Sequence, residues 1–202
     1  NETKIRLDNL YTPRDYQRPI FDAIENKGYK KAILCWPRRC LHGDTHITMS
    51  DGSFRLLKDL KVGDSILSWN GTTFEPDMVA NIWETEPKKT IKIRTSWPDG
   101  YIITSYDHKF LRYNTFTCKL RWTKARYLKY GDKLFTNYRS CRLLEHGIEY
   151  ITIKTIEDGP TCELFDMETT KNHNFIANGY VVHNSGKDTT LWHLILRQAL
   201  RR

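Results

Sequence analysis

Two distant positions of the chain carry side chains that could exchange one peptide bond for another. The thiol of Cys40 could attack the preceding carbonyl, that of Arg39. Asn184 could close its side-chain amide onto its own backbone carbonyl, and the hydroxyl of Ser185 could accept an acyl group. An asparagine holds nucleophile and carbonyl in one residue, which gives a proximity advantage without substrate binding. These groups predict that residues 40–184 remove themselves and join their flanks.

The flanks of this block read as two halves of a phosphate-binding loop. A buried strand is predicted over residues 31–36, before a basic turn, while Ser185-Gly186-Lys187 and a helix over residues 189–202 follow the block. Joined, they give strand, basic loop, Gly-Lys and helix, in which backbone N–H groups and a lysine hold phosphates. The nucleotide-binding residues expected in the joined flanks are Arg38, Arg39, Ser185, Gly186, Lys187 and Thr189.

Two positions of this loop depart from the usual pattern. Trp36 occupies the place of the first glycine, and Asp188 stands where a hydroxyl normally binds magnesium, which leaves Thr189 as the candidate ligand. The order of elements, preceded by a helix around Tyr16 and Gln17, resembles the ATPase domain of phage terminase large subunits. A basic turn with a chance Gly-Lys pair is the alternative.

The composition indicates a soluble globular chain. Of its 202 residues, 39% are hydrophobic and 28% charged. No apolar run approaches the roughly 18 residues of a membrane span, which argues against membrane insertion. Five cysteines without CxxC spacing argue against a disulfide framework or a zinc site and favour a reducing compartment. Most of the net charge of +8 lies in the flanks, because residues 40–184 nearly balance their acidic and basic side chains.

Within the block, turn signals separate short runs rich in Val, Ile, Thr, Tyr and Phe. These runs predict strands over residues 45–49, 90–95, 101–104 and 150–156, and hence an all-β domain. No internal repeat is expected. Near the end of the block, the pair Asn178-Gly179 between two apolar runs predicts a two-residue hairpin that delivers His183 and Asn184 to a fixed place.

Short motifs run through the block in a fixed order. They are Cys40-Leu41-His42-Gly43-Asp44-Thr45, Leu57-Lys58-Asp59-Leu60-Lys61-Val62-Gly63-Asp64, Asp107-His108-Lys109-Phe110-Leu111, Trp122-Thr123-Lys124-Ala125, Leu128-Lys129-Tyr130-Gly131-Asp132, Leu164-Phe165-Asp166-Met167, Asn172-His173-Asn174-Phe175 and Val182-His183-Asn184-Ser185. Together they resemble an intein, the self-splicing element that shares its fold with hedgehog autoprocessing domains. The resemblance implies a mainly β, compact horseshoe of this intein/hedgehog (HINT) type, with short α/β host fragments at both ends.

The resemblance also implies roles at the first junction. His108 would donate a proton to the leaving nitrogen of the bond between Arg39 and Cys40. Ser105, or its neighbour Thr104, would orient this histidine. The family usually has threonine at the position of Ser105, so the hydroxyl is retained.

Roles at the second junction follow from the same resemblance. Asp166 would manage the proton of Cys40 and link the two junctions. His183 would polarise the carbonyl of Asn184, and His173 would assist proton transfer. The serine after the block would carry the acyl group as an ester, and an O-to-N shift would complete the ligation.

The expected organisation is a host fragment over residues 1–39, a splicing domain over residues 40–184 and a second host fragment over residues 185–202. No homing-endonuclease motif is present, and residues 136–149 form only a short connection, as in a mini-intein. Splicing would need no cofactor, metal or partner. ATP, magnesium and viral DNA are expected only for the spliced host, in the cytoplasm of a bacterial cell.

Two other functions remain open. A hedgehog-like domain would make only the thioester and pass it to an outside nucleophile, which requires neither Asn184 nor Ser185. A non-catalytic protein that binds nucleotide or nucleic acid, with an embedded β-domain, is the other alternative.

The remaining histidines and cysteines are expected to be structural. They are His42, His46, His146 and His193, with Cys118, Cys141 and Cys162 as thiols in a β-core. Cys35 would fill a strand of the host domain. A disulfide between Cys35 and Cys40 that blocks the reaction is a further hypothesis, and it requires Cα atoms within ~7 Å.

Overall fold

The computed structural model describes residues 22, 26–27, 40–97, 100–137 and 149–184. The chain divides into two units, Asn1–Trp36 with Gly186–Arg202 and Pro37–Ser185, and every element described below lies in the second. The helices and the strand expected in the flanks lie outside the described residues, as does most of the connection over residues 136–149.

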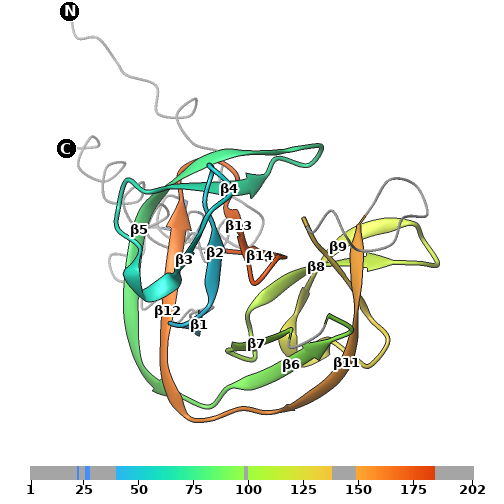
Figure 1. The fold of residues 1–202 in the computed structure, drawn as a ribbon. Helices are drawn as coiled ribbons and strands as arrows, with labels where there is room; N and C mark the ends of the chain where they lie inside the picture. The colour runs from blue at the N-terminus through green and yellow to red at the C-terminus, as the bar shows by residue number, and fades with distance from the viewer. Residues whose placement is uncertain (1–21, 23–25, 28–39, 98–99, 138–148, 185–202) are drawn as a thin grey trace, which may run out of the picture. The chain divides into compact units, whose positions relative to one another are not determined.

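The described part of the second unit folds almost entirely as β-strands (Figure 1). Its helical elements are two single-turn 3-10 helices, η2 (Leu57–Asp59) and η3 (Ala125–Tyr127). The strands are β1 (Leu41–His42), β2 (His46–Thr48), β3 (Phe54–Leu56), β4 (Ser65–Trp69), β5 (Phe74–Lys88), β6 (Ile91–Thr95), β7 (Tyr101–Thr104), β8 (Lys109–Asn114), β9 (Lys119–Lys124), β10 (Lys133–Phe135), β11 (Tyr150–Asp158), β12 (Cys162–Thr169), β13 (Asn174–Ala177) and β14 (Tyr180–His183). The four strands predicted from the sequence correspond to β2, β6, β7 and β11, and the prediction of a mainly β fold is confirmed.

The strands form one continuous path of hydrogen-bonded neighbours. Its order is β3-β2-β13-β14-β8-β10-β11-β6-β7-β1-β12-β5-β4, and β9 pairs with β8 beside it. The long strands β5 and β12 run side by side and curve along one side of the molecule (Figure 1). The short strand β1 has antiparallel neighbours on both sides, β7 and β12. The start of the block is therefore enclosed by strands from its middle and its end.

The predicted hairpin joins β13 to β14. Its turn, Asn178-Gly179, has φ +46° at the asparagine and +81° at the glycine, as a type I′ turn requires. The strands pair antiparallel through Asn174 and His183. One further step in this register sets His173 opposite Asn184, at the end of the block.

Two copies of one local structure follow the 3-10 helices. Residues 60–64 after η2 and residues 128–132 after η3 share a leucine, a lysine, a glycine and an aspartate. In each copy the lysine N–H donates to the aspartate carboxylate, at 2.8 and 2.9 Å, and the glycine has a positive φ, of +92° and +83°. An arginine, Arg55 or Arg112, pairs with the aspartate at 2.7 Å in both. The expectation of no internal repeat was wrong, because a matching segment of five residues is too short to stand out in the sequence.

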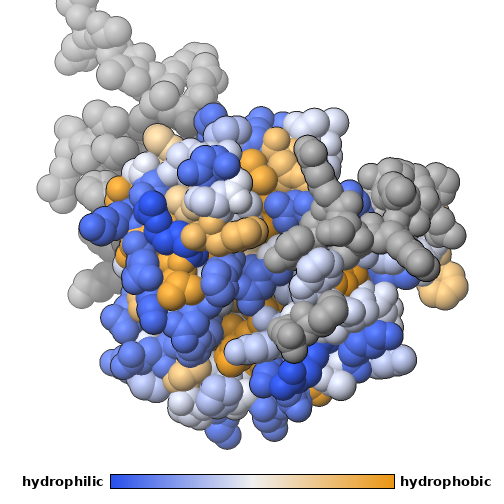
Figure 2. Space-filling model, in the orientation of Figure 1, coloured by the Kyte–Doolittle hydropathy of each residue, from blue (hydrophilic) through white to orange (hydrophobic). Residues whose placement is uncertain are grey.

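Apolar side chains from all parts of the block fill one main core. Leu41, Ile93, Phe110 and Val182 are each fully buried in it. The outer face in Figure 2 is mostly hydrophilic, with small, scattered hydrophobic areas. None of the helices in the described ranges is long and apolar enough to cross a membrane.

A buried carboxylate on β5 holds the loop that leads to His173. Asp77 is 1% exposed and accepts hydrogen bonds from the Thr170 hydroxyl at 2.7 Å and the Asn172 N–H at 2.9 Å. The N–H groups of Met78 and Lys171 also donate to it, at 2.7 and 3.1 Å. Burial alone would raise the pKa of Asp77, but these donors outweigh burial and lower it below its ordinary value.

We expect Asp77→Asn to lower the free energy of unfolding by about 2–3 kcal/mol, because hydrogen bonds to a charged group contribute about 1.5–3 kcal/mol each and the amide oxygen replaces them only in part. Urea unfolding measures this in a background of Cys40→Ala with Asn184→Ala, which removes the nucleophiles predicted for the first step and for the cyclisation. Since folding depresses the pKa of Asp77, its contribution is full above the ordinary value of about 3.9 and is lost as the pH falls below it.

Asp59→Asn is the matched control, because the Asp59 side chain is exposed at the end of η2. It should change the unfolding free energy by less than about 0.5 kcal/mol. Equal effects of the two substitutions at neutral pH would show that Asp77 does not hold the loop.

Candidate active site

Cys40 lies directly before β1 and is fully buried. In β1, Leu41 pairs with Thr104 on one side and with Phe165 on the other. Continuing both antiparallel registers by one residue sets Cys40 between Ser105 and Asp166. The carboxyl group of Asp166 comes from β12 and the residue is 4% exposed. Strand pairing thus brings together three of the predicted catalytic residues.

Main-chain and hydroxyl groups bind both polar backbone atoms of Cys40. Its N–H donates to the Ser105 hydroxyl oxygen at 3.0 Å. Its carbonyl oxygen accepts from the Ser105 N–H at 2.9 Å and from the Thr104 hydroxyl at 3.1 Å. The nitrogen of Cys40 belongs to the peptide bond with Arg39. The Ser105 hydroxyl therefore contacts the amide that the predicted first step would break. The Thr104 hydroxyl binds the carbonyl of Cys40 itself, one residue further along the chain.

His108 sits at the end of a tight turn that begins at Ser105. Its N–H donates to the Ser105 carbonyl at 3.1 Å, and its own carbonyl accepts from the Ala125 N–H at 2.7 Å. The side chain is 1% exposed, and its ring meets the edge of Phe110 with centroids 5.5 Å apart. The turn and the 3-10 helix η3 therefore fix the backbone position of this histidine.

The residue before this histidine carries the charge that anchors the turn. The Asp107 carboxylate pairs with Lys124 at 2.9 Å and with Arg126. Burial raises the pKa of Asp107, but hydrogen bonds from the two cations outweigh burial and hold it below its ordinary value. The carboxylate stays ionised at neutral pH and ties the turn to β9 and η3.

At the other end of the block, Asn184 is also fully buried. Its backbone N–H donates to the His173 carbonyl at 3.1 Å, which extends the hairpin ladder by one step. His173 has φ +54°, in the left-handed region that non-glycine residues seldom adopt. The hairpin and the loop held by Asp77 together place this carbonyl.

His183 lies against the carbonyl at which the second cleavage is predicted. Its Nδ1 contacts the Asn184 carbonyl oxygen. The edge of Trp122 meets the imidazole ring, with centroids 4.8 Å apart and an angle of 76° between the planes. Trp122 was not identified as a site residue from the sequence, where it formed part of a motif without an assigned role.

A second residue without an assigned role binds the Asn184 side chain. With each amide atom facing a complementary partner, Nδ2 donates to the His173 carbonyl at 3.0 Å, and Oδ1 accepts from the Thr169 N–H at 2.9 Å and its hydroxyl at 3.2 Å. The opposite orientation would set Nδ2 against the Thr169 N–H. No local signal in the sequence marked Thr169, because only the fold brings the end of β12 beside the end of β14.

The other predicted residues lie outside the described part of the chain. They are Arg38, Arg39, Ser185, Gly186, Lys187 and Thr189, together with Cys35, Cys141, His146 and His193. Their assignments stay predictions, as does the disulfide hypothesis. Cys118 was expected in the core, and this was wrong: it is exposed with φ +51°, because it closes the turn between β8 and β9. Cys162 is half-buried on β12.

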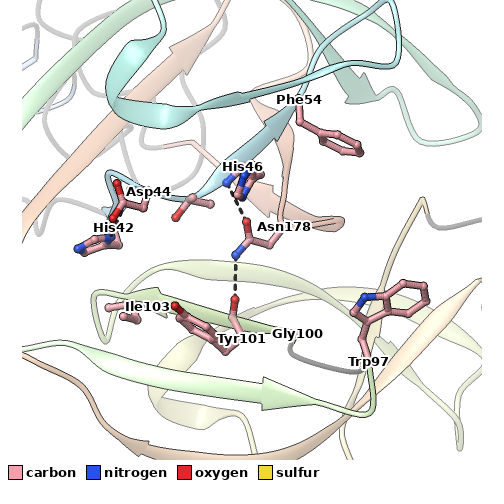
Figure 3. A pocket seen from close by; sticks show the side chains of 10 residues that line it. His42, Asp44, His46, Phe54, Trp97, Gly100, Tyr101, Ile103 and Asn178 are labelled. Carbon is pink, nitrogen blue, oxygen red and sulfur yellow. Dashed lines mark hydrogen bonds and ion pairs between the residues drawn. The ribbon is translucent and has the colours of Figure 1, made fainter.

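A cavity of about 570 Å³ opens beside β2 and contains none of the predicted catalytic residues. In Figure 3 the Asn178 side chain crosses it, accepting from the His46 N–H and donating to the Tyr101 carbonyl, both at 2.8 Å. His42 accepts the Asp44 N–H at 3.2 Å. The polar side chains of Asn178 and His42 that line this cavity thus make hydrogen bonds within the fold. In the described ranges, no group of three or more His, Cys, Asp or Glu is arranged to hold a metal ion.

Solved structures that resemble this fold include inteins and an intein-like domain. A crystal structure of a DnaB intein from Synechocystis sp. PCC 6803 matches with TM-score 0.62 and 23% identity, over 73% of this chain and 99% of that chain. The gp41-1 intein matches with TM-score 0.57 and 26% identity, over 73% and 100%. A bacterial intein-like domain from Clostridium thermocellum matches with TM-score 0.59 and 17% identity, over 74% and 100%.

These neighbours identify the fold as that of inteins and support a protein-splicing domain of the mini-intein type. Among curated sequences, subunit rpc2 of DNA-directed RNA polymerase III from Dictyostelium discoideum is 34% identical over 102 residues. That match covers 48% of this chain but spans only 6% of the polymerase subunit. No family model matches the sequence.

We expect Ser105→Ala to lower the unfolding free energy by about 1–3 kcal/mol, because it leaves the buried Cys40 N–H without its acceptor. Ser105→Thr keeps the hydroxyl and serves as the control. Both are measured by urea unfolding in the background of Cys40→Ala with Asn184→Ala. If alanine is tolerated as well as threonine, the Ser105 hydroxyl is not the group that holds this amide.

Proposed function

We propose that residues 40–184 excise themselves by autocatalytic protein splicing and join Arg39 to Ser185. The observation that supports this most directly is at the second junction. There the Asn184 carbonyl oxygen contacts Nδ1 of His183, and the Asn184 N–H is bound by the His173 carbonyl. A buried asparagine whose carbonyl faces a histidine has the groups that cyclisation requires.

In the first step, the Cys40 thiol attacks the Arg39 carbonyl and its proton is taken up. The bond to the Cys40 nitrogen breaks, that nitrogen gains a proton, and a thioester forms. The Ser105 hydroxyl holds the leaving nitrogen, and His108 supplies the proton. Asp166, which the strand register sets opposite Cys40, receives the thiol proton.

In the second step, the Ser185 hydroxyl attacks the thioester and releases the Cys40 thiol, which leaves a branched ester. A serine hydroxyl is barely ionised at neutral pH and needs a positioned base. This step is therefore expected to be slow compared with that of a cysteine acceptor.

In the third step, the Asn184 side-chain nitrogen attacks the Asn184 carbonyl carbon. A five-membered succinimide closes, the bond to the Ser185 nitrogen breaks, and the proton lost from Nδ2 is balanced by the one gained on that amine. His183, protonated at Nδ1, donates to the carbonyl oxygen as charge develops there. The released amine then attacks the ester, and the O-to-N shift leaves an ordinary peptide bond.

The proposal extends to the host. Ligation of Arg39 to Ser185 would restore the phosphate-binding loop of an ATPase resembling the phage terminase large subunit. Sequence order alone supports this part: the basic turn before the block, and Gly186-Lys187 with a predicted helix after it.

Under reducing conditions, the wild-type chain is expected to yield residues 40–184 and the ligated flanks, as measured by intact mass. Cys40→Ala should permit only cleavage after Asn184, since the thioester cannot form. Asn184→Ala should permit only cleavage before Cys40, induced by added thiol. A single full-length wild-type species at several temperatures would contradict splicing. Cleavage before Cys40 alone, unaffected by Asn184→Ala, would instead indicate hedgehog-like chemistry.

The unspliced chain is expected not to bind ATP, because the block separates the two halves of the loop. Isothermal titration of the Asn184→Ala chain with ATP and magnesium measures this. The same chain with Lys187→Ala is the control, since it removes the predicted phosphate ligand. Binding by the Asn184→Ala chain that Lys187→Ala abolishes would contradict the interrupted-loop assignment.

A further inference from the structure

Thr169 binds the Asn184 side chain through two hydrogen-bond donors, and both donate to the same amide oxygen. Oδ1 of Asn184 accepts the Thr169 N–H at 2.9 Å and its hydroxyl at 3.2 Å, while Nδ2 donates to the His173 carbonyl at 3.0 Å. Both residues are almost completely inaccessible to solvent, with Thr169 1% exposed. Because water does not reach this site easily, the hydrogen bonds to the amide oxygen come from Thr169.

The Thr169 N–H is free to reach Asn184 because it takes no part in the ladder between β12 and β5. The register between β12 and β5 shifts between Glu168 and Thr169. The extra residue of this bulge is Ala80 on β5, whereas Thr169 keeps a partner, Val79. Here the Thr169 N–H bonds to the side chain at the end of β14, and the ladder resumes with the Thr170 N–H donating to the Met78 carbonyl at 3.0 Å.

Two donors on Oδ1 have a specific chemical effect on the amide nitrogen. An amide nitrogen is a weak nucleophile, because its lone pair is delocalised onto oxygen. When Nδ2 loses a proton as it attacks, negative charge is shared with Oδ1, and donors already aimed at that oxygen stabilise it without reorganisation. The same donors fix the rotation of the side chain, so that Nδ2 stays on the side of the His173 carbonyl.

We propose that Thr169 is a positioning residue for asparagine cyclisation, whose hydroxyl and N–H stabilise the imidate character of the Asn184 amide. This inference rests on the splicing function proposed above. The bond that forms joins Nδ2 to the Asn184 carbonyl carbon, and the bond that breaks joins that carbon to the Ser185 nitrogen. The proton leaves Nδ2 and the departing amine gains one, so no oxidant, reductant or further reactant is needed.

The test isolates cyclisation in the full chain carrying Cys40→Ala, where release of residues 185–202 reports cleavage after Asn184. Thr169→Val removes the hydroxyl and keeps the shape, and Thr169→Ala removes it without adding a methyl group. Both are expected to slow the release about tenfold or more, because each leaves only the N–H donor on Oδ1. Thr169→Ser keeps the hydroxyl and should stay within about threefold of threonine. Intact mass over time gives the rates.

A second readout separates this role from simple packing. In the full chain with Asn184→Ala, thiol-induced cleavage before Cys40 should proceed at the same rate whether threonine is kept or replaced through Thr169→Val or Thr169→Ala. Slowing of both junctions by Thr169→Val would overturn the proposal, as would a serine variant as slow as the valine one. So would a valine variant that cleaves after Asn184 within about threefold of the rate with threonine.

The splicing function and the role of Thr169 are contradicted by different results. If the chain with Thr169 intact never cleaves after Asn184, the splicing function itself fails. If that chain cleaves and Thr169→Val cleaves equally fast, splicing stands and the role of Thr169 is refuted.

Discussion

The two-residue strand β1 fixes the geometry on which the first junction depends. It is paired on both sides, with β7 and with β12, so Cys40 has one position relative to Ser105 and Asp166. A slip of one residue in either pairing would turn every side chain of β1 to the opposite face. Register is strongly specified here because Leu41 is fully buried. The position of Cys40 is thus set by the burial of its apolar neighbour and by the pairing of β1 on both sides.

Strand β12 physically connects the two ends of the block. Asp166 lies beside Cys40 in the strand register, and three residues later Thr169 holds the Asn184 side chain. A displacement along this strand would therefore change the geometry at both junctions. The β5 partner stabilises it, and Asp77 of β5 also holds the loop that follows β12. One pair of strands supports both ends of the block, which would couple the steps of the proposed reaction.

Local patterns in the sequence predicted the all-β character and the Asn178-Gly179 hairpin, because strand alternation and type I′ turns depend on residues close in the chain. The same patterns did not reveal Thr169, Trp122 or Asp77. Each acts through a partner that only the fold brings near, such as Asn184 for Thr169 and His183 for Trp122. The repeat after η2 and η3 escaped notice for a different reason, since the matching segment is only five residues long and its shared turn geometry and ion pair are visible only in the structure.

The turn at Asn178 has a consequence for the chemical durability of the chain. An asparagine followed by glycine is the pair most prone to spontaneous deamidation, because the glycine nitrogen can close a succinimide ring on the side-chain carbon without steric hindrance. In the folded chain both atoms of the Asn178 amide are engaged, with His46 and with Tyr101. The hydrogen bonds that hold the Asn178 amide therefore restrain at this turn the same ring closure that is proposed as the useful reaction at Asn184.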